Sequence, residues 1–147
     1  MSINGVSVTV ILVSKDKKVL IVQRSKEKSF PGKWVVPGGK VTVEDGMEPN
    51  TDGIRYYSAE ARGMLEVHEE TGISILGDLK YLCTMTLPNG RMVVSYYHEL
   101  PVESSEINVT LNSENMDYRW VTRETMNYDY VAGMDSEIMI ALERVGG

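Results

Sequence analysis

The 147-residue chain has few of the sequence features that mark disulfide-bonded, membrane-spanning or secreted proteins. It has a single cysteine, Cys83, so no disulfide can form within it. The longest early apolar run, residues 6–13, is interrupted by Ser7 and Thr9 and is too short to span a bilayer. No basic segment followed by an apolar core and a cleavage site marks a signal peptide. We therefore expect a cytoplasmic protein that makes no membrane contact.

Basic residues are also in deficit. There are 15 Lys and Arg against 21 Asp and Glu, which gives a net charge of −6. Proteins that bind nucleic acids generally use basic surfaces to neutralise backbone phosphates, so this balance disfavours general nucleic-acid binding. An acidic protein can still act on a polyphosphate when bound metal ions invert the local field.

Repeats, low-complexity blocks and interdomain linkers are missing, so we expect a single domain over residues 1–147. β-Branched runs at 6–14 and 19–23, joined by 15–17, predict a hairpin. Runs at 79–87 and 91–100 flank Asn-Gly, the strongest short hairpin signal. The other predicted elements are an acidic loop at 101–114, a strand at 118–121 and a helix at 136–144. This pattern alone indicates a fold with both α and β structure.

The most informative stretch of the chain is 66–73, the glutamate-rich part of a predicted helix that ends at Gly72. At about 100° per residue, Arg62, Glu66, Glu69 and Glu70 fall within roughly a quarter of the helix circumference. Because three acids on one side repel each other, a hard divalent cation such as Mg²⁺ or Mn²⁺ would offset the cost. A solvated acidic helix face is the alternative explanation of the same pattern.

The boundaries of this helix can be predicted too. Ser58 is a good N-cap, and Gly72 is placed for a left-handed C-cap. Gly63 should weaken the helix slightly. The arc next to the carboxylates should pack on the sheet, which makes its histidine a packed residue and not a ligand; the arc consists of Ala61, Met64, Leu65 and His68.

Upstream, residues 30–41 predict a short strand leading into a Pro37-Gly38-Gly39 turn, whose glycines allow close backbone approach. Together with the helix, this segment resembles the Nudix hydrolase family. The family signature is Gly, five residues, Glu, seven residues, then Arg-Glu-apolar-any-Glu-Glu-any-Gly-apolar. The second half is in register at Glu66, Val67, Glu69, Glu70, Gly72 and Ile73.

The chain departs from the signature at two points. Leu65 occupies the arginine position, so either Arg62 or Arg55 is expected to take over the positioning of Glu69. Counting back from the helix places the first signature glutamate at Tyr57, eighteen positions after Gly39. The loop is thus about a dozen residues longer than the signature allows.

Two acids of this lengthened loop, Glu44 and Glu48, are candidates for the missing glutamate, although each also fits an ordinary solvated loop acid. The loop at 42–56 could act as a lid or reach a neighbouring subunit. Base rates among soluble proteins favour a homodimer.

The resemblance implies an α/β/α sandwich with a mixed central sheet. It also implies hydrolysis of a phosphoanhydride bond with Mg²⁺ or Mn²⁺, in which the metal orients the phosphates and a carboxylate takes a proton from the attacking water. The metal ligands would be Glu66, Glu69, Glu70 and Gly39. Glu69 is also the candidate base, with Glu66 and Arg62 completing the catalytic set, and the two roles of Glu69 exclude each other at any instant.

Phosphate contacts are expected from Arg24, which ends a strand, and from Lys40, which follows Gly38 and Gly39; both basic residues equally fit a solvated surface. The substrate stays open among a nucleoside triphosphate, ADP-ribose, a dinucleoside polyphosphate and a nucleotide sugar. Aromatic side chains that could stack on a base, although most of them also fit core or sheet positions, are Tyr81, Tyr96, Tyr97, Tyr118 and Trp120. Leu65 supports an alternative in which the fold binds or senses a nucleotide without hydrolysing it, whereas the three glutamates favour the enzyme.

Overall fold

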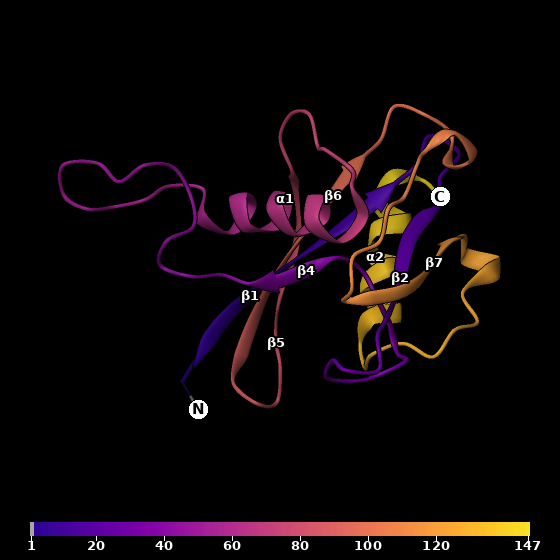
Figure 1. The fold of residues 1–147 in the computed structure, drawn as a ribbon, viewed down its shortest axis with the longest axis horizontal. Coiled ribbons are helices and arrows are strands. Elements are labelled where there is room, and N and C mark those ends of the chain that lie inside the picture. The colour runs from indigo at the N-terminus through magenta and orange to yellow at the C-terminus, as the bar shows by residue number, and fades with distance from the viewer. Residues whose placement is uncertain (1) are drawn as a thin grey trace.

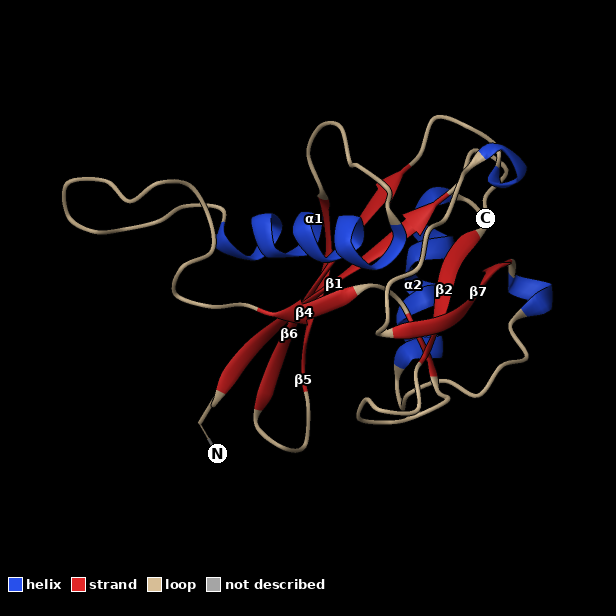
Figure 2. Ribbon diagram, viewed as in Figure 1, coloured by secondary structure: helices blue, strands red, loops and turns tan. Residues whose placement is uncertain are grey.

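The computed structural model describes residues 2–147. Over this range the chain forms a seven-stranded sheet and two α-helices, shown in Figure 1 and Figure 2. The helices are α1 (Ser58–Thr71) and α2 (Met134–Val145), and short 3₁₀ turns occur at Ser104–Glu106 and Arg123–Thr125. The strands are β1 (Gly5–Val13), β2 (Val19–Arg24), β3 (Trp34–Val35), β4 (Gly38–Lys40), β5 (Lys80–Thr86), β6 (Arg91–Glu99) and β7 (Asn115–Val121).

The sheet is mixed, as predicted. Its order is β3-β2-β1-β6-β5, with β4 paired to β1 and β7 paired to β2. The β1 and β6 strands run parallel from Gly5↔Arg91 to Val13↔Glu99, whereas the other pairs are antiparallel. Both predicted hairpins are present, β1–β2 and β5–β6, and β7 and α2 each extend beyond their predicted ranges.

The two helices cover opposite faces of the sheet. Successive residues of a strand point to opposite faces, and β1 divides its buried side chains accordingly. Val10 packs in the core layer that includes Val67 of α1, whereas Ile11 packs in the layer that includes Ile138 of α2. The predicted α/β/α sandwich is confirmed. Among the described residues, no helix combines the length and the apolar character needed to cross a membrane.

Helix α1 contacts the sheet through a glycine. A Cβ added at Gly63 would lie 2.8 Å from Cγ2 of Val10, so only glycine lets the helix come this close. The buried residues of α1 are Gly63, Val67, Glu70 and Thr71. The predicted contact arc is wrong for Leu65, which is 43% exposed, and for His68, which is also exposed. Close approach at Gly63 turns the helix so that Glu70 faces the protein interior.

Two local predictions need correction. Residues 38–40 form strand β4, not a turn, with Thr9↔Gly38 and Ser7↔Lys40 as partners on β1. A Cβ at Gly38 would collide with the carbonyl oxygen of Val8, which explains the glycine within a strand. Helix α1 starts at Ser58 itself, because the left-handed Tyr57 (φ 61°) takes the cap position without a side-chain cap bond. The C-cap at Gly72, with φ 76°, is confirmed.

Between β4 and α1 the chain forms an arm, residues 46–57, which projects away from the sheet in Figure 1. The arm holds its shape through its own backbone, because Met47 N–H donates to the Tyr56 carbonyl and Asn50 N–H donates to the Ile54 carbonyl, each at 3.0 Å. Its large apolar side chains are exposed; they are Met47, Ile54, Tyr56 and Tyr57.

Candidate active site

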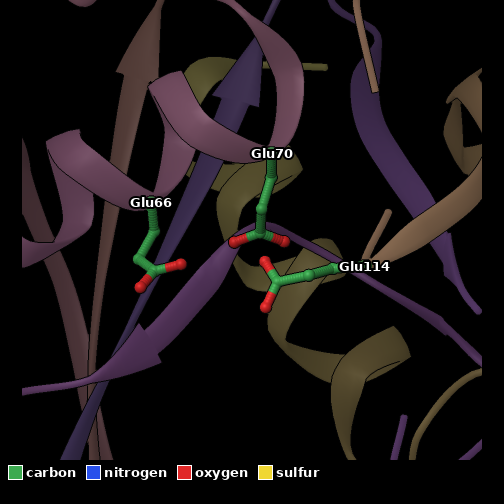
Figure 3. Close-up of side chains that lie close together, drawn as sticks. All are labelled: Glu66, Glu70 and Glu114. Carbon is green, nitrogen blue, oxygen red and sulfur yellow. The ribbon is translucent and has the colours of Figure 1, made fainter. Parts of the chain in front are cut away.

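Three glutamate side chains converge beside the C-terminal half of α1. Glu66 and Glu70 come from α1, and Glu114 comes from the residue that precedes β7. Each offers a carboxylate oxygen, and these oxygens all lie within 4.8 Å of one another; Figure 3 shows the three side chains facing the same space. We call these residues the carboxylate cluster.

The fold explains why these residues meet. Glu66 and Glu70 are four positions apart and therefore share one side of the helix. Strand β7 pairs with β2 so that Asn115 lies opposite Arg24. The preceding residue, Glu114, therefore lies close to Glu66 and Glu70. The cluster thus joins segments that are more than forty positions apart in the sequence.

Glu70 is the most buried member of the cluster, with 6% of its surface exposed. Its Oε1 accepts a hydrogen bond from the Asn115 amide at 3.0 Å, and its Oε2 accepts one from the Gly38 N–H at 3.2 Å. Burial is the main cause that raises the pKa of Glu70 to about 8, opposed by the Asn115 hydrogen bond and reinforced by the charge of Glu66. Glu70 therefore binds a proton, or needs a cation, near neutral pH.

Glu66 is held by Arg62, one helical turn before it. Nη1 of Arg62 donates to Oε1 of Glu66 at 3.1 Å, while Nε and Nη2 donate to the two oxygens of Asp45 at 3.0 and 2.8 Å. This bidentate bond is the main cause that lowers the pKa of Asp45. Burial raises the pKa of Glu66, although the Arg62 hydrogen bond opposes it. Arg62 therefore ties the start of the loop to the cluster.

Arg62 lies where the sequence predicted it, but its partner differs. Among the described residues, its guanidinium contacts Glu66 and Asp45 and makes no hydrogen bond to Glu69. The other candidate, Arg55, donates to the Met47 carbonyl within the arm. Glu69 is exposed and lies outside the carboxylate cluster. Its role as a ligand or base stays a prediction.

Asp45 is a site residue that the sequence interpretation missed. It follows Gly39 by six positions, which is the spacing that the Nudix signature gives to its first glutamate. The additional loop residues therefore come after this position. Counting forward from Gly39, and not back from the helix, would have found Asp45. Glu44 and Glu48, the predicted candidates, are both exposed.

Glu114 was missed as well, because the sequence assigned it to a solvated acidic loop. Lys28 donates to its Oε1 at 3.0 Å, and this hydrogen bond is the main cause that lowers the pKa of Glu114. Its position depends on the pairing of β7 with β2, and no local pattern in the sequence specifies that pairing. The signal for Glu114 was therefore nonlocal.

A cavity of about 700 Å³ opens beside the carboxylate cluster. Four predicted substrate-binding residues line it together, namely Arg24, Gly38, Gly39 and Lys40. The side chain of Arg24 donates to the carbonyl and the hydroxyl of Ser29. Gly39 lies directly against the cluster, because a Cβ there would approach Oε1 of Glu66 to 2.5 Å. Its assignment as a metal ligand stays a prediction.

Part of the cavity lining is apolar and consists of Val35, Val36, Val93, Val131 and Met134. The aromatic residue at this cavity is Phe30, which is 60% exposed. The tyrosines and the tryptophan considered as stacking candidates do not line the cavity in the described part of the chain. Tyr96 and Tyr97, for example, are each 8% exposed. Tyr96 and Tyr97 both lie on β6, between β1 and β5, where their side chains pack in the protein interior.

The chemistry of the cluster fits a divalent cation. Magnesium, manganese and calcium bind oxygen ligands at roughly 2.0–2.6 Å, so two ligands of one ion lie at most about 5 Å apart. The 4.8 Å limit within the cluster meets this requirement. Glu66 and Glu114 each pair with a basic side chain through Oε1, whereas Glu70 has only neutral donors. A cation here would give Glu70 the positively charged partner that it lacks among the described residues.

Comparisons with known proteins show which sequences and folds this chain resembles. Residues 3–49 match the family model of the NUDIX domain, while no curated protein matches the chain. Solved structures with the same fold include a MutT protein from Methanosarcina mazei Go1, with 24% identity, a TM-score of 0.67, and coverage of 99% of this chain and 96% of that one. The NUDIX domain of Shewanella oneidensis NrtR, complexed with ADP ribose, has 21% identity, a TM-score of 0.74, and coverage of 99% and 90%. A C. elegans Ap4A hydrolase has 16% identity, a TM-score of 0.60, and coverage of 96% and 98%.

Proposed function

We propose that this chain, a Nudix protein by its family match and its fold, is a metal-dependent pyrophosphohydrolase. Its substrate would be a nucleoside diphosphate linked to another group, cleaved by water at a phosphoanhydride bond. The observation that carries the proposal is the carboxylate cluster, whose oxygens lie within 4.8 Å of one another beside a cavity that also presents Arg24 and Lys40. Clustered acids facing basic residues suit a metal-bound polyphosphate.

Each part of this site has a distinct task in the proposed reaction. Glu66, Glu70 and Glu114 would hold Mg²⁺ or Mn²⁺, which supplies positive charge to the phosphate oxygens and makes water a better nucleophile. Arg24 and Lys40 would bind the phosphates directly. Arg62 positions Glu66, and Asp45 positions Arg62.

The base for the attacking water comes from α1 in this proposal. Glu69 is an exposed residue of α1 next to Glu70 and lies outside the carboxylate cluster, so in this proposal it acts on the attacking water instead of holding the metal. A loss of turnover in Glu69→Gln with intact metal binding would assign it as the base. A parallel loss of metal binding would assign it as a ligand.

The cavity suits a nucleotide in size and polarity. Its volume of about 700 Å³ lies within the usual range of small-molecule sites, and its apolar lining residues offer contacts to a base or a second group. The candidates stay a nucleoside triphosphate, ADP-ribose, a dinucleoside polyphosphate and a nucleotide sugar.

Product release from a panel of these four substrate types, with Mg²⁺ or Mn²⁺, tests the proposal. We expect metal-dependent turnover of at least one of them, and a loss of roughly a hundredfold or more in Glu66→Gln, Glu70→Gln and Glu114→Gln. Glu106→Gln is the matched control, because Glu106 is an exposed acid outside the cluster. Failure to hydrolyse any phosphoanhydride in the panel would refute the enzyme.

A nucleotide sensor without hydrolysis is the second candidate. The observation in its favour is Leu65, which occupies the signature arginine position and points to solvent with 43% exposure. The NrtR NUDIX domain, complexed with ADP ribose, provides a relative to which the chain can be compared. Calorimetric binding of a panel nucleotide without turnover would favour the sensor over the enzyme.

A further inference from the structure

Two hydroxyl groups of β1 line the cavity on the face of the sheet that packs against α2. Ser7 and Thr9 lie two positions apart on β1, so both side chains point to this face, and both residues line the cavity. Their neighbours on the parallel strand β6 are Val93 and Ser95, respectively. Both hydroxyls are therefore polar groups of this wall, beside Lys40, which pairs with Ser7 on β4.

A buried carboxylate determines how Thr9 is oriented. Glu137 of α2 is 3% exposed, and its Oε2 accepts hydrogen bonds from the Thr9 hydroxyl at 2.7 Å and from the Ser95 hydroxyl at 3.0 Å. Glu137 does not itself line the cavity, and the proposed reaction does not use it. It is therefore a buried acid whose donors all come from the sheet.

The hydrogen bonds to Glu137 limit what Thr9 can offer a ligand. A hydroxyl has one hydrogen to donate and two lone pairs to accept with. The hydrogen of Thr9 is engaged by Glu137, so only its lone pairs remain for the cavity. Ser7 has the opposite polarity, because its oxygen accepts from Nε of Arg91 at 2.6 Å and its own hydrogen stays available. The wall therefore presents an acceptor at Thr9 and a donor at Ser7.

We propose that Thr9 is a specificity-determining residue that selects a nucleotide whose base presents an amino group, and that Glu137 is the positioning residue that keeps Thr9 an acceptor. The proposal rests on the proposed nucleotide substrate. A base with an exocyclic amino group, such as adenine or cytosine, donates to Thr9. Hypoxanthine and uracil carry a carbonyl at the corresponding position, and that oxygen faces the Thr9 lone pairs without a hydrogen between them.

The apolar surroundings make this discrimination effective. Val93, the β6 neighbour of Ser7, and Met134 both line the cavity, so a base bound against them loses the water that could bridge a mismatched pair. A site that leaves a buried polar group unpaired rejects the mismatched ligand more strongly than a wet surface does. We expect a preference of roughly tenfold for the amino base.

Calorimetric binding of two nucleoside monophosphate pairs, AMP with IMP and CMP with UMP, tests the proposal. These probes contain no phosphoanhydride, so the measurement does not depend on hydrolysis. We expect the wild-type chain to bind the amino member of at least one pair roughly tenfold more tightly. In Thr9→Val, which keeps the shape but loses the hydroxyl, the preference should fall to within about twofold.

Three further variants separate the two residues. Glu137→Met frees the Thr9 hydrogen to rotate, so the preference should fall although Thr9 is still present. Thr9→Ser keeps the hydroxyl and should keep the preference. Ser95→Ala is the matched control, because it removes the other donor to the same oxygen of Glu137 and leaves the bond from Thr9 intact.

Equal binding of both members of each pair by the wild-type chain would overturn the proposal, as would an unchanged preference in Thr9→Val. Urea unfolding establishes whether each variant is folded. If Thr9→Val is not folded, the loss of preference is tested with Glu137→Met instead. Amino-selective binding without turnover of any panel substrate would refute the hydrolase but support the role of Thr9. Turnover of a panel substrate without amino-selective binding would support the hydrolase and refute the role of Thr9.

Discussion

Two buried glutamates face the same sheet from opposite sides, and they differ in what surrounds them. Glu70 of α1 is 6% exposed and Glu137 of α2 is 3% exposed, and burial raises the pKa of both. Glu70 lies beside two other acids and accepts from an amide and a backbone N–H. Glu137 accepts from two hydroxyls, and no acidic cluster surrounds it within residues 2–147. The proposed cation would complete the first environment, whereas the second already has two hydroxyl donors.

The largest expected effect comes from removing the positively charged side chain of Arg62, on the α1 side of the sheet. Arg62→Ala should lower kcat by roughly a hundredfold, because Glu66 and Asp45 lose the guanidinium that fixes them. Steady-state kinetics of the metal-loaded enzyme measures this loss. Arg62→Lys should recover part of the rate, since lysine restores the charge but not the bidentate geometry.

Arg119→Ala is the control for that variant. Arg119 pairs with Asp117 at 2.7 Å on the surface, away from the cavity, so its loss should leave kcat within about twofold of the wild type. Full turnover in Arg62→Ala would show that Glu66 needs no arginine to hold its position.

Metal binding should distinguish Glu70 from an acid outside the carboxylate cluster. At a Mn²⁺ concentration 100 times its dissociation constant, the free energy of unfolding should rise by about 2.7 kcal/mol. Urea unfolding with and without Mn²⁺ measures this gain. The gain should vanish in Glu70→Gln and persist in Glu106→Gln. An equal gain in wild type and Glu70→Gln would place the ion elsewhere.

The pH dependence of stability follows from the raised pKa of Glu70. In the metal-free protein, the native state holds a proton on Glu70 between pH 4.5 and about 8, whereas the unfolded chain has released it. Stability therefore falls as pH rises through this window, by at most about 1.4 kcal/mol per pH unit. Below pH 4.5 and above about pH 8, Glu70 contributes no slope.

Urea unfolding at intervals from pH 5 to pH 8 checks this slope by subtraction. Glu70→Gln lacks the titration, so the difference between wild type and variant isolates Glu70 from Glu66 and Glu137, whose pKa values are also raised. Saturating Mn²⁺ should remove the difference in slope, because a bound cation keeps Glu70 ionised. Parallel curves for both proteins would mean that Glu70 titrates normally.

The smallest effect is expected from the arm. Replacing residues 48–55 with a short Gly-Ser turn, while keeping Asp45, should change the free energy of unfolding by less than about 1 kcal/mol, because the arm makes its hydrogen bonds within itself. Asp45→Ala in the full-length chain should cost more in both stability and kcat. A large loss of affinity or turnover on shortening would instead identify the arm as a lid or as a contact with a second copy.

Local patterns predicted much of the fold. Hairpins, the glutamate helix and its Gly72 cap depend on residues close together in the sequence, and the structure has them. The face of α1 was harder to predict, because the steric effect of Gly63 against Val10 overrides the placement of apolar side chains such as Leu65. Helix orientation is decided by what the sheet can accommodate.

The site shows the same division. Glu66 and Glu70 share one helix, so helical spacing was enough to pair them. Glu114 joins them only through the pairing of β7 with β2, and Asp45 reaches Arg62 across a loop. Long-range strand order and loop closure are set by the whole fold, and a single sequence contains no periodic signal for either.

The arm has a consequence for how the chain could be lengthened. Gly39 and Asp45 keep the spacing of the signature, and the additional residues all follow Asp45. Because each doubling of a flexible loop costs only about 0.6 kcal/mol, chain can be added beyond this point at little cost. The tip of the arm, near Asn50 and Gly53, is thus an insertion point. A reporter or a second binding module placed there would leave the ion pair between Asp45 and Arg62 intact.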